Sequence, residues 1–191
     1  MRHPATVRLH GHLDRPAELT VGQLRDLPSH RVEVTFDCRT EGEQRHGYEG
    51  PTLWDVLCAA GPRVDLAARK PRLKFLLAVT GSDGHRAVVS WAEIDPDFGG
   101  QRILLATSMD GAPLDGSGPQ LVVPADHCGA RYVSGVTAVW LGPAPGPEPA
   151  PGPEPVAAEA VGAETVAPGH VATGHVAAGQ AGAGPAGAAR R

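Results

Sequence analysis

The sequence of 191 residues has few aromatic residues (4%), only three cysteines and no long apolar segment. No apolar run approaches the ~18 residues that a membrane-spanning helix needs. The first residues, Met-Arg-His-Pro-Ala-Thr-Val, contain no hydrophobic stretch of the kind found in secretory signals. Lys and Arg are mixed with Asp and Glu, which argues against a nucleic-acid surface. The sequence therefore predicts a cytoplasmic protein with no membrane span and no nucleic-acid partner.

Several motifs of common enzyme and metal-binding classes are also missing. The cysteines Cys38, Cys58 and Cys128 are odd in number and lack CxxC spacing, a pattern typical of reduced thiols and not of a disulfide framework or a zinc site. There is no GxGxxG, Walker loop, GxSxG or HExxH motif. Nucleotide hydrolysis and serine-hydrolase chemistry are therefore not supported.

The composition changes sharply at Pro143. Residues 143–191 contain no Leu, Ile, Lys or aromatic residue, and nine of the 19 prolines lie there among Ala, Gly and Val. Such a segment has too little apolar bulk to offset the entropy lost on ordering it. We expect one domain over residues 1–142 and a disordered Pro/Ala/Gly-rich tail over residues 143–191.

Within the domain, predicted strands outnumber predicted helices. Alternating or continuous apolar residues predict strands over 6–11, 31–38, 73–80, 85–90, 102–107, 120–124 and 133–141. Capping-box patterns at Thr20, Thr52 and Ser90 predict three short helices. The polar residues 41–50, which include two interior glycines, predict a loop before the helix at Leu53–Ala60. This pattern indicates an α+β fold with a mixed β-sheet and short helices.

Cys38 is the first candidate for chemistry. Alternation along residues 31–38 places it with Val34 and Phe36 on the apolar face of its strand. One interpretation is a buried structural cysteine, because free cysteine is among the most buried residue types. The other is a thiolate at a strand end that binds a soft metal.

Two further candidates lie in turns. In the loop at residues 126–131, the backbone amides of Gly129 and Ala130 can approach an anion, and the Arg131 guanidinium suits a phosphate. The alternative is an ordinary surface loop with an arginine at its rim. His85, after Asp83-Gly84, is either a proton donor beside a pocket or an exposed turn residue.

Several stretches, taken in order, resemble the oxidoreductase molybdopterin-binding domain of the sulfite oxidase family, which includes the catalytic subunits of bacterial methionine sulfoxide reductases. The resemblance covers residues 6–142. It rests on a Gly-x4-Pro-x2-Leu-Thr-x3-Leu pattern ending at Leu24, Cys38 ten residues before Tyr48-Glu-Gly-Pro-Thr-Leu53, Gly81-Ser-Asp-Gly-His-Arg-Ala87 with Ala92-Glu-Ile94, Leu104-Leu-Ala106 with Asp110-Gly-x-Pro-Leu114, Pro119-x-Leu-Val-Val-Pro124, and Gly129-Ala-Arg131.

The resemblance implies a sulfite oxidase-like fold and a molybdopterin cofactor. Cys38 would be the protein thiolate on molybdenum, and Gly129, Ala130 and Arg131 would receive the pterin phosphate. His85 would stand where relatives often carry Tyr near the substrate. The implied activity is oxygen-atom transfer on a small oxyanion or an S- or N-oxide, with electrons exchanged with a separate partner.

Two other functions stay open. The chain could be a cofactor-free binding module that retains the fold. It could also be a thiol redox protein that uses Cys38 and Cys128, which requires their Cα atoms to lie within about 7 Å.

Overall fold

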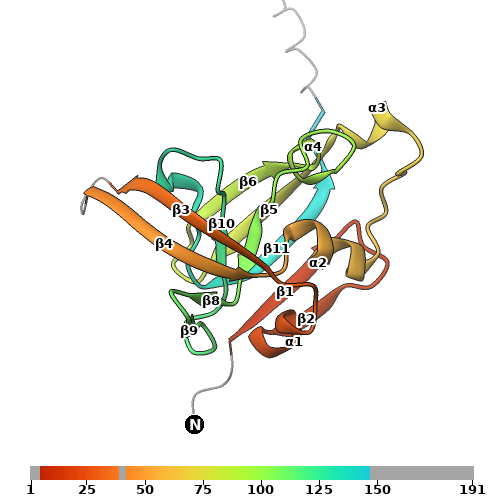
Figure 1. The fold of residues 1–191 in the computed structure, drawn as a ribbon. Helices are drawn as coiled ribbons and strands as arrows, with labels where there is room; N and C mark the ends of the chain where they lie inside the picture. The colour runs from red at the N-terminus through yellow and green to blue at the C-terminus, as the bar shows by residue number, and fades with distance from the viewer. Residues whose placement is uncertain (1–4, 39–41, 147–191) are drawn as a thin grey trace, which may run out of the picture. The chain divides into compact units, whose positions relative to one another are not determined.

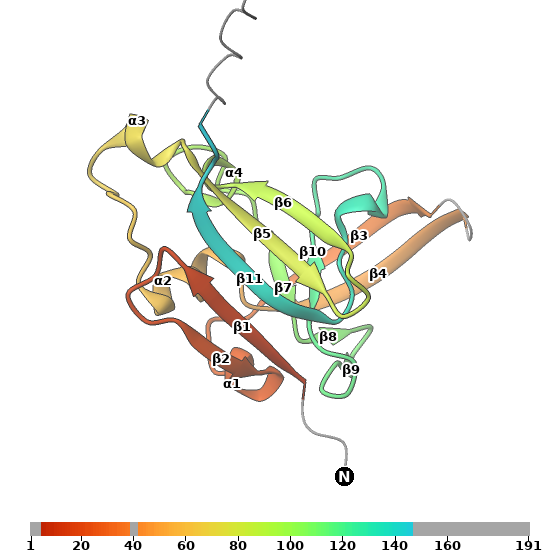
Figure 2. The same cartoon turned by 180° about the vertical axis from the view of Figure 1, so that it is seen from behind.

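Three β-sheets make up most of the structure, a computed structural model that describes residues 5–38 and 42–146 (Figure 1). The largest sheet has the strand order β2-β1-β11-β5-β6, and Figure 2 shows it from the opposite side. Its strands are β1 (Thr6–Gly11), β2 (Ala17–Thr20), β5 (Phe75–Gly81), β6 (Arg86–Ser90) and β11 (Val136–Pro143). Since β1 pairs with β11 in parallel and the other neighbours are antiparallel, the sheet is mixed, as the sequence predicts.

A four-stranded sheet and a two-stranded sheet complete the described fold. The first has the order β3-β4-β8-β9 and the second pairs β10 with β7. Their strands are β3 (His30–Cys38), β4 (Gly42–Gly50), β8 (Ser108–Met109), β9 (Ala112–Pro113), β7 (Leu104–Ala106) and β10 (Gln120–Val122).

The helices of the described residues are short. They are α1 (Val21–Arg25), α2 (Leu53–Ala60), α3 (Arg69–Arg72), α4 (Trp91–Ile94) and the 3-10 turn η1 (Gly129–Arg131). Of these, α1, α2 and α4 begin where the capping boxes predict, whereas α3 and the 3-10 turn η1 were not predicted. The capping boxes of Thr20, Thr52 and Ser90 are all formed, so the side chain at each N-cap satisfies an otherwise unpaired backbone N–H of α1, α2 or α4.

One hydrophobic core joins residues from all three sheets. Burial alternates along β5, where Leu77 and Val79 are fully buried, as expected for a strand with one face in the core. They belong to the same cluster as Tyr48 of β4, Leu57 of α2 and Leu105 of β7. This continuous packing holds the β3–β4 hairpin and the loops in fixed positions.

The loop predicted over residues 41–50 is wrong, because residues 42–50 form the strand β4. It pairs antiparallel with β3 along its whole length, from His30 opposite Gly50 to Cys38 opposite Gly42. Much of β4 is solvent-exposed, so its residues are mostly polar. The alternation of apolar and polar residues that predicts a strand is therefore missing from this segment.

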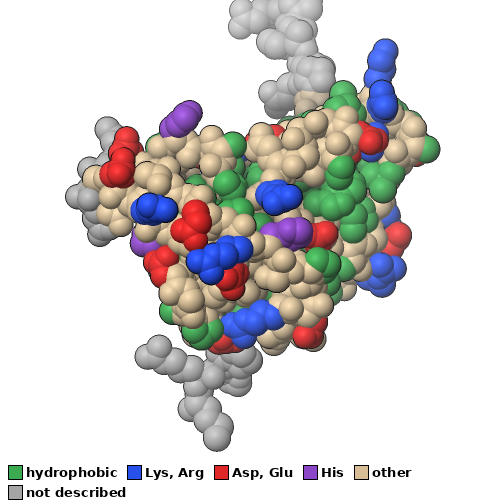
Figure 3. Space-filling model, viewed as in Figure 1, with side chains coloured by type: hydrophobic (Ala, Val, Ile, Leu, Met, Phe, Trp, Pro, Cys, Tyr) green, Lys and Arg blue, Asp and Glu red, His purple; other side chains and the backbone are tan. Residues whose placement is uncertain are grey.

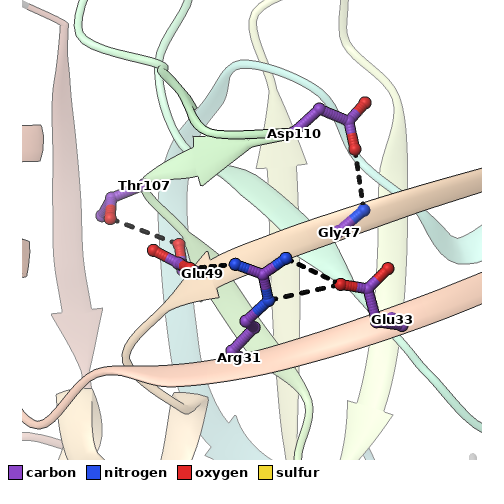
Figure 4. Close-up of polar contacts among 6 residues, drawn as sticks. All are labelled: Arg31, Glu33, Gly47, Glu49, Thr107 and Asp110. Carbon is purple, nitrogen blue, oxygen red and sulfur yellow. Dashed lines mark hydrogen bonds and ion pairs between the residues drawn. The ribbon is translucent and has the colours of Figure 1, made fainter.

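Polar contacts brace the exposed side of this hairpin (Figure 4). Arg31 of β3 donates to Glu33 on the same strand and to Glu49 on β4, each at 2.9 Å. The Asp110 carboxylate, in the β8–β9 turn, accepts from the backbone N–H of Gly47 at 2.8 Å. The hairpin is thus tied to β8 by side chains as well as by strand pairing.

The domain boundary and the tail predicted from composition remain predictions. β11 runs to Pro143, one residue beyond the predicted boundary, and Ala144 N–H still donates to the carbonyl of Lys74. Residues 147–191 lie outside the described residues.

Gly11 provides a test of the packing between β1 and β11. It has φ +99°, and a Cβ there would lie 2.1 Å from the carbonyl oxygen of Leu141. We expect Gly11→Ala to lower the free energy of unfolding by roughly 2–4 kcal/mol, from backbone strain and overpacking. Urea denaturation measures this. The matched control is Gly116→Ala, whose Cβ would meet nothing within 4 Å. Equal stability of the two variants would contradict this account.

Candidate functional site

The segment that carries Cys38 lies beside the loop that contains Arg131. Cys38 is the last residue of β3, and its side chain lies outside the described residues. The N–H of its neighbour Asp37 donates to the carbonyl of His127 at 3.2 Å, and Asp37 forms a parallel bridge with Cys128. The fold therefore brings together two candidate segments that are far apart in the sequence.

Arg131 is held by two carboxylates. Its Nε and Nη2 donate to Asp126 at 2.8 and 2.6 Å, and its Nη1 donates to Glu93 at 2.8 Å. Asp126 belongs to the same loop, whereas Glu93 lies on α4, where its other oxygen accepts from the backbone N–H of Ser90. Arg131 thus ties the loop at residues 126–131 to the N-terminal turn of α4.

The charges of this cluster stabilise one another. The hydrogen bonds that Arg131 donates to Asp126 and Glu93 raise the pKa of Arg131. For Glu93, partial burial favours the neutral acid, but the hydrogen bonds from Arg131 and Ser90 outweigh it and lower the pKa. An added phosphate would meet two carboxylates already bound to the guanidinium, and their negative charge would oppose its binding to the two N–H groups that remain.

Gly129 has a packing role in the structure. A Cβ at this position would lie 2.8 Å from the ring of Phe36 on β3, so only glycine lets the two segments approach this closely. The space beside the Gly129 Cα that the sequence suggested for an anion is therefore filled by an aromatic ring. Ala130 lies between Gly129 and Arg131 in η1 and is exposed.

Aromatic side chains of the β3–β4 hairpin pack against Tyr132. Tyr132 packs on Phe36 with ring centroids 4.7 Å apart and on Tyr48 at 6.4 Å. Burial raises the pKa of Tyr132 to about 12, with smaller contributions from Tyr48 and Asp126. Its hydroxyl is buried and has no hydrogen-bond partner among the described residues. Tyr132 is therefore a neutral hydrogen-bond donor close to the Arg131 loop.

His85 is exposed at the β5–β6 turn. Its backbone N–H donates to Asp83 at 2.9 Å, and its carbonyl accepts from Gly81. Four hollows of the described residues are lined by neither His85 nor Arg131. Its role near a substrate stays a prediction.

The described part of the chain offers no ready-made metal site. It contains no group of three or more His, Cys, Asp or Glu side chains placed to hold a metal ion. Cys128, beside the Asp37 bridge, and Cys58, on α2, are both exposed, and partial desolvation raises the pKa of the Cys58 thiol. A hollow of about 210 Å³ near the tip of the hairpin is lined by Thr35, Phe36, Asp37, Glu43 and His127.

Comparison with known proteins identifies the family. The family model of the oxidoreductase molybdopterin binding domain matches residues 3–145. The chain belongs to this family. No curated protein matches the sequence.

The fold is similar to that of the sulfane dehydrogenase SoxCD from Paracoccus pantotrophus. The crystal structure superimposes with a TM-score of 0.56 at 20% sequence identity, over 71% of this chain. This chain spans only 37% of the length of the SoxCD chain. The predicted mixed sheet with short helices is therefore confirmed, in a structure that is mostly sheet.

The described residues of this oxidoreductase molybdopterin-binding domain fit its cofactor at one end only. A molybdenum thiolate at position 38 would stand beside the loop at residues 126–131, as the family resemblance requires. The phosphate end does not fit as the residues stand, because Asp126 and Glu93 neutralise Arg131 and Phe36 covers Gly129. The hairpin hollow adds two more carboxylates, Asp37 and Glu43, and not a cation for the phosphate.

The sequence did not reveal the partners of Arg131. Glu93 belongs to a capping box and to the Ala92-Glu-Ile94 motif, and neither pattern links it to an arginine 38 residues later. Among the described residues, no helix is both long and apolar enough to cross a membrane.

The Arg131 cluster predicts a dependence of stability on acid. Because the pKa of Glu93 is lowered on folding, its contribution is present at neutral pH and is lost as the pH falls through and below the usual carboxyl range. We expect the melting temperature of the wild type to fall more steeply than that of Glu93→Gln between about pH 5 and pH 3. Calorimetry at several pH values measures both melting temperatures. Gln is the substitute because its side-chain oxygen can still accept the hydrogen bond that caps α4.

The matched control is Glu33→Gln, which removes an exposed ion pair with Arg31. Its acid profile should follow the wild type, since exposed pairs contribute little. A Glu93→Gln profile parallel to the wild type would show that the cluster does not stabilise the fold.

Proposed function

We propose that this domain is a molybdopterin-dependent oxidoreductase that transfers an oxygen atom to or from a small oxyanion or an S- or N-oxide. Cys38 would be the thiolate ligand of the metal. The observation that carries the proposal is the hydrogen bond from Asp37 to His127, which sets the backbone of position 38 beside the loop at residues 126–131. The family match over residues 3–145 supports the choice of cofactor.

When bound, the cofactor would supply the two-electron chemistry, and a separate partner would supply or accept the electrons. A thiolate suits this role because it is a soft ligand that tunes a redox metal. The chain's own residues would hold the ligand loop in place: Asp37 by its backbone bond, and Arg131 by its link to α4. Tyr132 offers a buried donor for an oxygen atom of a bound ligand.

A second candidate function is a cofactor-free binding module with the same fold. The observation that favours it is the state of Arg131, which donates three of its five N–H groups to two carboxylates, so that the negative charge around it opposes an additional anion. The two functions differ in one measurable quantity, the metal content of the folded protein.

The test is molybdenum content, measured by elemental mass spectrometry on protein made in a host that synthesises the pterin cofactor. We expect near-stoichiometric molybdenum in the wild type and almost none in Cys38→Ser. Cys58→Ser is the matched control, because Cys58 lies on α2 away from the loop, and it should retain the metal.

Full metal content in folded Cys38→Ser would exclude Cys38 as the ligand. A folded wild type without molybdenum would favour the binding module. Cys128→Ser tests the remaining alternative, since thiol redox chemistry needs Cys128 and a molybdenum thiolate at Cys38 does not.

A further inference from the structure

A second hollow lies at the opposite end of β3 from Cys38. It has a volume of about 180 Å³ and lies between the start of α2 and the segment after α4. The nine residues of β3 span about 26 Å at ~3.3 Å per residue, so the hollow lies far from the position of Cys38. Its lining residue Ile94 follows Glu93, the partner of Arg131. The residues that matter for its chemistry are His30, Trp54, Asp55, Gln101 and Arg102.

Asp55 provides a fixed carboxylate in this hollow. Its Oδ2 accepts from Nε2 of His30 at 3.1 Å and from the Thr52 hydroxyl at 2.6 Å. Its Oδ1, and Nδ1 of His30, have no hydrogen-bond partner among the described residues. The Asp55 side chain is 25% exposed, so Oδ1 can accept from a ligand that enters the hollow.

Arg102 provides a free cation on a rigid backbone. It is exposed and makes no hydrogen bond or ion pair with any described residue, unlike Arg131. Its neighbours are fixed, because Gln101 N–H donates to the carbonyl of Glu93 at 2.7 Å and Leu53 N–H donates to Ile103 at 2.8 Å.

The wall between the two charges is aromatic. Trp54 packs against the buried ring of Trp91, with ring centroids 5.4 Å apart, which holds the Trp54 ring in place. In the view of Figure 1 this region lies between α2 and α4. The same region of Figure 3 shows a histidine next to an acidic side chain, with a basic side chain above them and apolar side chains alongside.

We propose that this hollow binds a small zwitterion of the α-amino-acid class. Arg102 would pair with the carboxylate, Asp55 Oδ1 would accept from the ammonium, and Trp54 would contact the remaining part. An anion without an ammonium would be repelled by Asp55, and a cation without a carboxylate by Arg102. A small hollow that combines a carboxylate, a guanidinium without a protein partner and an aromatic side chain offers a few polar groups beside apolar surface, as ligand sites commonly do.

The experiment is a titration of the full chain with glycine, alanine, proline and leucine, followed by two-dimensional nitrogen–proton NMR. We expect saturable shifts of the Trp54 indole signal and the Gly100 amide, with a dissociation constant of about 1 mM or tighter for at least one amino acid. The indole signal of Trp140, on β11, serves as an internal reference. The N-acetylated and the amidated forms of that amino acid each lack one charge, and each should bind at least about tenfold more weakly than the free amino acid.

Arg102→Ala should weaken binding about tenfold while leaving the spectrum folded, because the side chain makes no internal contact. Arg86→Ala is the matched control, as Arg86 is also exposed and lies on β6. Asp55→Asn, which can still cap α2, should weaken binding of the ammonium.

The proposal fails if no amino acid gives saturable shifts when its concentration reaches about ten times the expected dissociation constant. It also fails if Arg102→Ala binds like the wild type, or if the blocked forms bind as well as the free amino acid. None of these results depends on molybdenum, so they leave the proposed oxidoreductase function unaffected.

Discussion

The strand β11 is the constraint on which the rest of the fold depends. It pairs with β1 in parallel on one side and with β5 in antiparallel on the other, so it unites the first and last parts of the domain in one sheet. Gly11 allows β1 to lie against β11 without a side chain between them. Strand pairings of such long sequence separation cost loop-closure entropy, and the shared core of Val7, Leu77 and Val139 offsets that cost.

From this sheet, the chain builds a hairpin with different chemistry at its two ends. The end at Cys38 lies beside Cys128 and the Arg131 loop, where the family resemblance predicts a cofactor. The end at His30 contacts the capped start of α2, where Asp55 serves as both a helix cap and a partner of histidine. One rigid element therefore separates a candidate redox site from a candidate site for a small zwitterion.

Arg131 shows that residue type alone does not determine function. A guanidinium next to Gly-Ala is suited to a phosphate, but here Asp126 and Glu93 satisfy it, and Phe36 occupies the space next to Gly129. Arg102 is the reverse case, an arginine with no motif around it that is free and lies in a hollow. The difference arises from which carboxylates the fold brings near each guanidinium.

The sequence by itself determined the elements whose signals are local. The capping boxes placed the starts of α1, α2 and α4 correctly, and apolar alternation placed most strands of the mixed sheet, because both depend on residues within a few positions of one another. The motifs in the sequence also predicted the family to which the chain belongs. Only the tertiary structure decided that residues 42–50 form a strand, that Glu93 neutralises Arg131 and that Arg102 shares a hollow with Asp55. The contacts of Arg131 and Arg102 depend on segments far apart in the sequence, and β4, whose exposed polar residues give no apolar alternation, depends on pairing with its neighbour β3.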